Sequence, residues 1–240
     1  MNSKRFPPSK RIAFAAAVLA VCSASCLPES AHNSRVRLCE KRAGELAGKV
    51  EPVLVAAFGK AGVEYPPRTA LLLAFKKEKL LELRAPRDGK YVPIKSYRVL
   101  GASGGPGPKL REGDRQVPEG IYPVTGLNPD SNYHLALAIG YPNDFDLAMA
   151  ARDGRTDPGG DIHIHGGDYS AGCLAVGDEA IEELFLLAVR TGPENLRVII
   201  APHAPPTPFR RPGGAPPWTD ELYRTIRAEL DRIDGSGVRR

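Results

Sequence analysis

Short apolar runs fill residues 70–200, and they constrain the fold more than any other feature of the chain. Glycine, proline or charged residues bound each run, which is the pattern of β-strands. The runs cover residues 70–75, 80–83, 91–100, 121–124, 133–139, 162–165 and 196–200. Residues 101–118 are rich in glycine, proline and charge and should form a long loop. The sequence therefore predicts a mainly β core of the α+β class.

Two further segments have the spacing of amphipathic helices. Residues 34–58 place apolar side chains every three or four positions, Cys39 among them, and Ser34 can cap the start. Pro52 is expected to kink or split this helix, because proline lacks an N–H and clashes with the preceding turn. A second helix should begin at Asp178, where acidic residues favour the positive helix end.

These patterns divide the chain into four parts. The expected parts are a signal peptide over residues 1–26, a helical segment over 27–68, a β-rich domain over 69–201, and a proline-rich linker with a C-terminal helix over 202–240. Thr219 is the expected cap of that last helix.

The N-terminus has the pattern of an export signal. Four basic residues and no acidic one precede an apolar run over residues 12–21, and small residues follow at 23–25. The run is shorter than the roughly 20 apolar residues that a membrane-spanning helix needs. Cys26 stands in an imperfect lipoprotein-type context, which leaves a lipid anchor there open. We therefore expect an exported protein of the periplasm or cell envelope.

The basic charge of the whole chain comes mainly from this signal. The chain has 33 basic and 28 acidic residues, and 29 basic residues remain once the four of the signal are set aside. A nucleic-acid-binding domain needs a basic stripe on its folded surface. The charge therefore gives no reason to expect a nucleic-acid partner.

The segment Asp161-Ile-His-Ile-His165-Gly-Gly-Asp-Tyr-Ser170-Ala-Gly-Cys173 carries the chemistry of a thiol enzyme. A nucleophilic thiol needs a base to take its proton and donors to hold an oxyanion. His165 ends a predicted strand, and the following loop is long enough to fold Cys173 back toward it. Gly172 lets a carbonyl approach the backbone beside the sulfur, and Ser170 adds a hydroxyl to the same turn. Cys173 is thus the candidate nucleophile and His165 its base.

Other readings of these residues remain open. A lone cysteine or histidine is commonly a buried structural residue, although a polar, glycine-rich segment is an unusual place for one. His163 and His165 alternate onto one strand face, so that Asp161, Asp168 or Cys173 could complete a zinc site. No second ligand cluster follows downstream, and no metal or other cofactor is expected.

The same segment resembles the active-site motif of the L,D-transpeptidase (YkuD) family, in which His-Gly precedes Ser-x-Gly-Cys. The resemblance is greatest to the YafK-like murein branch, and it extends from about residue 70 to residue 190. Further motifs in the order and spacing of that branch lie at residues 103–114, 118–122, 127–131, 139–143 and 178–183. The resemblance implies an L,D-transpeptidase-like β-sandwich as the catalytic domain, with a helix after the catalytic cysteine and flanking N- and C-terminal helices.

Carried to this chain, the resemblance makes Cys173 the acyl-accepting thiol and His165 the general base. Ser170 and Gly172 become part of the active-site turn, whose backbone N–H groups form the oxyanion site. Many family members have a histidine where this chain has Ala171, whereas the YafK-like branch usually has an apolar residue there. Ala171 removes a second imidazole, which argues against a mechanism that needs two.

The resemblance also implies a murein stem peptide as substrate, attacked at the L-centre carbonyl of a diamino acid. Such a substrate displays carboxylates and ammonium groups, so charged residues of the long loop are candidate partners. The candidate substrate-binding residues are Lys109, Arg111 and Asp114, with His163, and, on resemblance alone, Tyr133, Tyr141 and Asn143.

Four functions follow from these observations. The first is a cysteine-dependent L,D-transpeptidase whose thioester is resolved by an amine, which can belong to a murein-linked protein. The second is an L,D-endopeptidase or amidase of the same fold, in which water resolves the thioester and releases a cross-link or a bound protein. A non-catalytic murein-binding module and a zinc hydrolase are the distant alternatives.

Overall fold

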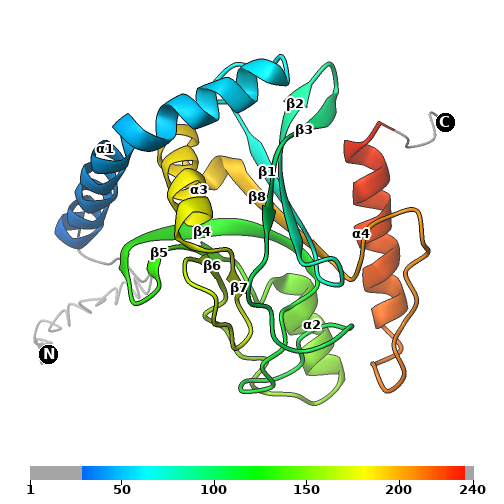
Figure 1. Ribbon diagram of the computed structural model, residues 1–240. Helices are drawn as coiled ribbons and strands as arrows, with labels where there is room; N and C mark the ends of the chain where they lie inside the picture. Colours follow the sequence, from blue (N-terminus) through cyan, green and yellow to red (C-terminus); the bar gives the residue numbers. More distant parts are fainter. Residues whose placement is uncertain (1–28, 236–240) are drawn as a thin grey trace, which may run out of the picture.

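The computed structural model describes residues 29–235, and the expectations for the signal peptide and for Cys26 lie outside these residues. Five consecutive strands follow the first helix, and the remaining strands lie between later helices (Figure 1). They are α1 (Glu29–Lys60), β1 (Ala70–Phe75), β2 (Leu80–Arg87), β3 (Lys90–Arg98), β4 (Gly120–Ser131), β5 (His134–Ile139), α2 (Asp144–Arg152), β6 (His163–His165), β7 (Leu174–Ala175), α3 (Asp178–Thr191), the short 3-10 helix η1 (Pro193–Asn195), β8 (Leu196–Ala201) and α4 (Thr219–Ile233). No helix within residues 29–235 combines the length and the hydropathy that crossing a membrane requires.

The strands form one connected mixed sheet in the order β3-β2-β1-β8-β4-β5-β6-β7. Most neighbours run antiparallel, while β1 pairs with β8 and β6 with β7 in parallel. The long strand β4 joins the two halves of the sheet: it pairs with β8 over residues 120–123 and with β5 over residues 124–131. The predicted α+β class with a mainly β core is therefore confirmed, and β4 is the strand that turns from one half to the other.

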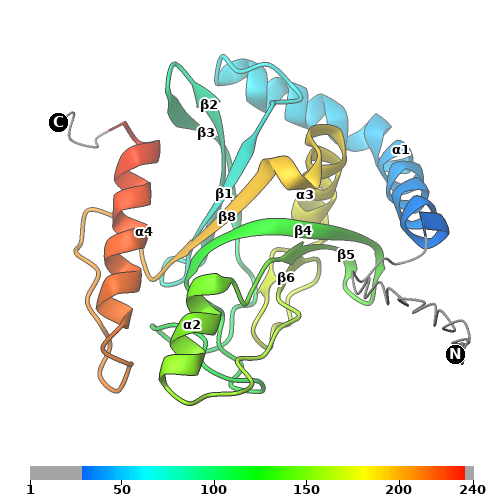
Figure 2. The ribbon, with the colours of Figure 1, turned by 180° about the vertical axis from the view of Figure 1, so that it is seen from behind.

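The unbroken apolar run of β1 is explained by burial on both faces. Leu72 and Ala74 belong to the core cluster that includes α1 and α3, whereas Leu71, Leu73 and Phe75 pack in a second cluster with α4. Figures 1 and 2 show α3 and α4 on opposite sides of β1 and β8. A strand in the centre of such a sheet needs apolar side chains in both directions.

The expectations for the two terminal helices are partly wrong. α1 begins at Glu29, so Ser34 lies inside the helix and does not cap it. Pro52 does not split α1, which runs unbroken to Lys60 and changes direction along its length (Figure 1). Val50 and Leu54, on either side of Pro52, are buried, and their packing offsets the cost of a proline inside the helix. At the other end, Trp218 is the N-cap of α4, no side chain caps it, and the hydroxyl of Thr219 has no hydrogen-bond partner.

Three elements were not predicted: η1, and two elements that lie beside the candidate site, β7 and α2. β7 is only Leu174–Ala175 and starts directly after Cys173. α2 begins with a capping box, because the Asn143 side chain accepts from the Asp146 N–H while the Asp146 carboxylate accepts from the Asn143 N–H. The capping signal Asn-x-x-Asp is present in the sequence. The helix that follows it is short and mostly exposed, so it has no clear apolar period that would predict it.

Candidate active site

Cys173 lies next to His163 because β6 and β7 run parallel. Ile164 pairs with Leu174 and His165 with Ala175, so Cys173 continues this register opposite His163. His163 and His165 project to the same side of β6, since alternate residues of a strand share a face. The glycine-rich loop over residues 166–172 thus returns the chain to β6 and brings the thiol to the strand that carries both histidines.

Backbone groups hold the Cys173 sulfur. The N–H of His163 donates to Sγ over 3.4 Å, and the thiol faces the carbonyl oxygen of Asp161 at 3.8 Å. Asp161 adopts a left-handed backbone conformation with φ of 55°, which is uncommon for a residue other than glycine. Burial raises the pKa of the Cys173 thiol, and the His163 N–H partly offsets this. At rest the sulfur is therefore a protonated thiol rather than a thiolate.

His165 is held in the tautomer that a general base requires. Its ring is buried, with 3% exposed, and Nδ1 lies 2.7 Å from the carbonyl oxygen of Gly166. A carbonyl can only accept, so Nδ1 carries the proton and Nε2 keeps its lone pair. Burial also lowers the pKa of His165, so the imidazole is neutral near pH 7. The ring of Tyr133 covers it at a centroid distance of 4.5 Å.

Ser170 shapes the turn before the thiol. Its hydroxyl donates to the Cys173 carbonyl over 2.6 Å and accepts from the Gly172 N–H over 3.3 Å. Gly172 has φ of 123°, a conformation that side chains other than hydrogen disfavour. Because Ser170 occupies the Gly172 N–H, the N–H groups of Ala171 and Cys173 are the candidates for an oxyanion site.

Cys173 and His165 line one cleft of about 350 Å³. The structure brings two of the predicted substrate-binding residues, Tyr133 and His163, into the same cleft. Its remaining lining residues were not predicted as substrate-binding: Arg35, Asn128, Ser131, Asn132, Ala136 and Asp161. Within residues 29–235, no hydrogen bond joins Sγ of Cys173 to His165.

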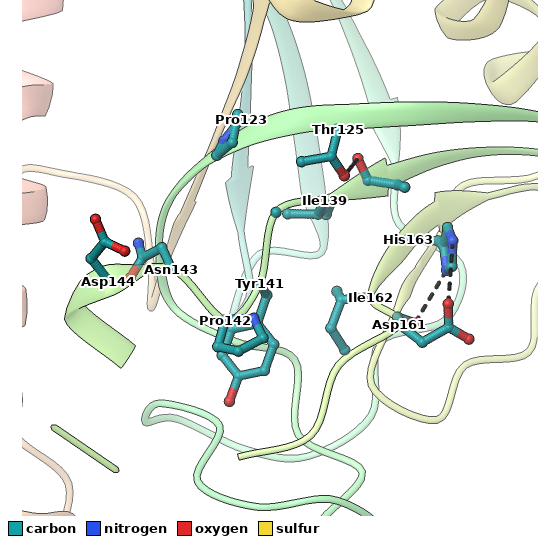
Figure 3. Close-up of a pocket in the computed structure, with 12 residues that line it drawn as sticks. Pro123, Thr125, Ile139, Tyr141, Pro142, Asn143, Asp144, Asp161, Ile162 and His163 are labelled. Carbon is teal, nitrogen blue, oxygen red and sulfur yellow. Dashed lines mark hydrogen bonds and ion pairs between the residues drawn. The ribbon is translucent and has the colours of Figure 1, made fainter. Parts of the chain in front are cut away.

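A second cleft of about 640 Å³ adjoins the first and shares His163 and Asp161 with it. Figure 3 shows His163 beside Asp161 at one end of this cleft and Asn143 at the other. Tyr141 lines it and donates its hydroxyl to the carbonyl of Pro158 over 2.9 Å. Asn143 also lines it, but its amide is engaged in capping α2 and in donating to Ile121.

The predicted charged residues of the long loop bind one another. Lys109 is buried, and its ammonium donates to Asp114 Oδ1 over 2.7 Å and to the Arg111 carbonyl over 2.9 Å. Asp114 also accepts from the backbone N–H groups of Leu110, Arg111 and Gln116. The Arg111 side chain is exposed. None of these three residues lines the Cys173 cleft, so in this structure Lys109 and Asp114 fix the loop.

The geometry does not favour a metal centre. Among residues 29–235, no three His, Cys, Asp or Glu side chains are placed to bind one ion together. Nδ1 of His163 faces the Asp161 carbonyl at 3.1 Å, just as Nδ1 of His165 faces Gly166. Cys39 and Cys173 are both free thiols.

Known proteins resemble this chain in sequence over its β-rich part. Residues 70–200 match the YkuD family model, described as the L,D-transpeptidase catalytic domain. The YafK protein of Escherichia coli (strain K12) is 38% identical over 133 residues, which cover 53% of this chain and 52% of YafK. YafK of Escherichia coli O157:H7 matches to the same extent. The chain therefore spans about half the length of these relatives.

Solved structures give more distant likenesses. The helical cell shape determining protein Pgp2 from Campylobacter jejuni is 25% identical, with a TM-score of 0.44, over 57% of this chain and 49% of Pgp2. Bd1075 of Bdellovibrio bacteriovorus is 20% identical, with a TM-score of 0.44, over 70% of this chain and 56% of Bd1075. The assignment rests on the sequence matches. Because the family model covers more than half of its residues, the chain belongs to the YkuD family of L,D-transpeptidase catalytic domains.

Proposed function

We propose that this protein is a cysteine-dependent L,D-transpeptidase that acts on peptidoglycan stem peptides through a thioester on Cys173. The observation that carries the proposal is the placement of His165: its Nδ1 lies 2.7 Å from the Gly166 carbonyl oxygen, which leaves Nε2 as the proton acceptor, and its ring lines the same cleft as Cys173. Membership of the family supports the reaction class.

The reaction follows from these groups. Nε2 of His165 takes the proton of the Cys173 thiol, and the sulfur attacks the carbonyl carbon of the diamino acid. The N–H groups of Ala171 and Cys173 stabilise the oxyanion. The C–N bond then breaks, the protonated His165 gives its proton to the departing amine, and a thioester remains. An incoming amine attacks the thioester, loses a proton to His165 and releases Cys173.

Water can replace the amine in the last step. The product is then a hydrolysed peptide, and the protein acts as an L,D-endopeptidase or amidase that releases cross-links or murein-bound protein. The acyl-enzyme half of the reaction is common to both outcomes, so the product distinguishes them. We favour the transpeptidase and take a murein-linked protein as one candidate acceptor.

Peptidoglycan lies outside the cytoplasmic membrane, so the proposed substrate requires export. The basic and apolar pattern of residues 1–26 supports a periplasmic or envelope location, with Cys26 as the candidate lipid anchor. Cell fractionation and mass spectrometry of the mature N-terminus test this part of the proposal. A full-length protein in the cytoplasm would contradict it.

The test of the function compares wild type with Cys173→Ala, using tetrapeptide-containing muropeptides and intact sacculi. Cys39→Ala is the matched control, because it removes the other free thiol of the described domain. We expect a thioester adduct and cross-linked or amine-exchanged products from wild type and from Cys39→Ala, and neither from Cys173→Ala. Products that contain added water would establish the hydrolase instead. Binding to sacculi without any product would leave only a murein-binding module.

A further inference from the structure

The Cys173 cleft displays two opposite charges that do not pair with each other. Arg35 reaches it from α1, and Asp161 reaches it from the segment before β6. Within residues 29–235, Arg35 and Asp161 form no ion pair with each other, and Arg35 forms no ion pair with any other carboxylate. Both charges therefore remain available to a ligand in the cleft.

Arg35 is oriented by the backbone of β4. Its Nε donates to the carbonyl oxygen of Leu127 over 3.0 Å. A guanidinium has five N–H donors in one plane, so four remain after this bond and can form the two-pronged contact that a carboxylate prefers. The helix that carries Arg35 is fixed to the domain, because Cys39 and Ala43 of the same helix lie in the main core cluster.

The carboxylate of Asp161 is exposed to solvent, whereas its backbone carbonyl faces the thiol. Its carbonyl oxygen faces both Cys173 Sγ and Nδ1 of His163. The side chain is 95% exposed, and its Oδ1 lies 3.7 Å from Nε2 of His163. The carboxylate is thus anchored through a constrained backbone and is free to accept from an ammonium group.

We propose that Arg35 and Asp161 form a subsite for a zwitterionic amino-acid centre, with Arg35 binding its carboxylate and Asp161 its ammonium group. The inference rests on the proposed function, since the ligand is part of the peptide that reacts at Cys173. A diamino acid that keeps a free amine and a free carboxylate on one carbon has this chemistry. The neutral side chains of Asn128, Ser131 and Asn132 line the same cleft and add hydrogen-bonding groups without competing charge.

The test measures peptide binding by calorimetry in a Cys173→Ala background, which separates recognition from reaction. Three tetrapeptides differ at one residue: diaminopimelate carries both charges at its far centre, lysine lacks the carboxylate, and 2-aminopimelate lacks the amine. Arg35→Ala and Asp161→Asn are the test variants. Arg37→Ala is the matched control, because Arg37 is exposed on the same helix and does not line the cleft.

We expect the parent and Arg37→Ala to bind the diaminopimelate peptide about tenfold more tightly than either analogue. Arg35→Ala should lose the preference over the lysine peptide, and Asp161→Asn should lose the preference over the aminopimelate peptide. Thermal unfolding should be unchanged in both, since both side chains are exposed. Equal weakening for all three peptides, no preference in the parent, or no binding at all would overturn the subsite.

Thioester formation by the wild-type protein is measured separately with the diaminopimelate peptide. Charge-selective binding without a thioester would overturn the proposed function and retain the subsite. A thioester without charge-selective binding would overturn the subsite alone.

Discussion

The hydrogen bond from His163 to Cys173 comes from the backbone N–H and not from the imidazole, and it spans 3.4 Å. Any residue other than proline at position 163 keeps this donor. The side chain of His165, in contrast, is the group whose lone pair is directed by the bond between Nδ1 and Gly166. His163 therefore contacts the thiol through its backbone, whereas the proposed role of His165 depends on its side chain.

The first prediction follows from this difference. His165→Gln removes the proposed base and should lower kcat/KM for thioester formation by about 10²–10⁴-fold. His163→Gln keeps the backbone donor and should lower it by less than about tenfold. Stopped-flow acylation followed by mass spectrometry measures both. Equal losses in the two variants would contradict the assignment of His165 as the base.

The second prediction concerns the resting thiol. Burial raises the pKa of Cys173, so the thiolate forms only as pH rises through that raised value. Alkylation by iodoacetamide in the absence of substrate should be slow near about pH 7 and should rise about tenfold per pH unit into the alkaline range. Peptide mass mapping at each pH gives the rate at Cys173. A plateau already reached below about pH 7 would indicate a thiolate–imidazolium pair instead.

Sequence reasoning found the strands and the reactive segment because both are local patterns. The run over residues 70–75 is buried on two faces and reads as a strand without further knowledge. Lys109 and Asp114 were expected to meet substrate, since charges in a loop of glycine and proline look exposed. The hydrogen bond from Lys109 to Asp114 forms only when the loop folds, and no sequence spacing predicts it.

Most of the cleft residues that were missed lie far from the motif in sequence, Asp161 being an exception. Arg35 belongs to α1 and Asn128 to β4, and packing of these elements brings both to Cys173. The sequence contains a helical period for α1 but nothing that specifies which turn faces the thiol. Long-range packing, rather than any local preference, completes the site.

The third prediction concerns a buried ion pair that anchors the long loop. Lys76 donates to the Gly107 and Val117 carbonyls and lies 3.1 Å from Glu119, which in turn accepts from the Gly107 N–H. Glu119→Leu leaves the Lys76 ammonium buried without its counter-charge and should lower the free energy of unfolding by about 3–5 kcal/mol. Urea unfolding measures this.

The double variant Lys76→Met with Glu119→Leu is the control for this pair. It removes both charges, so it should recover part of the loss, because an uncompensated buried charge costs more than an absent pair. A double variant no more stable than Glu119→Leu alone would contradict the prediction.

The fourth prediction is a pH dependence of stability that arises at Asp146. Burial raises the pKa of this carboxyl to about 6, although the hydrogen bond from the Asn143 N–H lowers the pKa in part. The folded state therefore holds the proton more tightly than the unfolded chain, and stability falls as pH rises from about 4 to about 6. The loss should reach about 2–3 kcal/mol by neutral pH.

Asp146→Asn should make this decline shallower, since an amide does not titrate and can still accept from the Asn143 N–H. Asp144→Asn is the control, because Asp144 is exposed in the same helical turn. Urea unfolding at about pH 4.5 and about pH 7 measures the slope of each protein. The same slope in wild type and Asp146→Asn would rule out this carboxyl as its source.

The fifth prediction tests the backbone that orients His165. A Cβ on Gly166 would lie 2.6 Å from the Tyr133 carbonyl oxygen and 2.5 Å from Asp178 Oδ1. Gly166→Ala must therefore displace either the Tyr133 backbone or its own carbonyl, which holds Nδ1 of His165.

We expect Gly166→Ala to lower kcat/KM by about tenfold or more, because a misplaced base loses its alignment with the thiol. Gly160→Ala is the matched control, since a Cβ there meets nothing within 4 Å. Thioester formation measures the rate, and proton NMR of the imidazole shows whether the Nδ1 proton keeps its bonded chemical shift. If Gly166→Ala and Gly160→Ala react equally fast, the Gly166 carbonyl does not position the base.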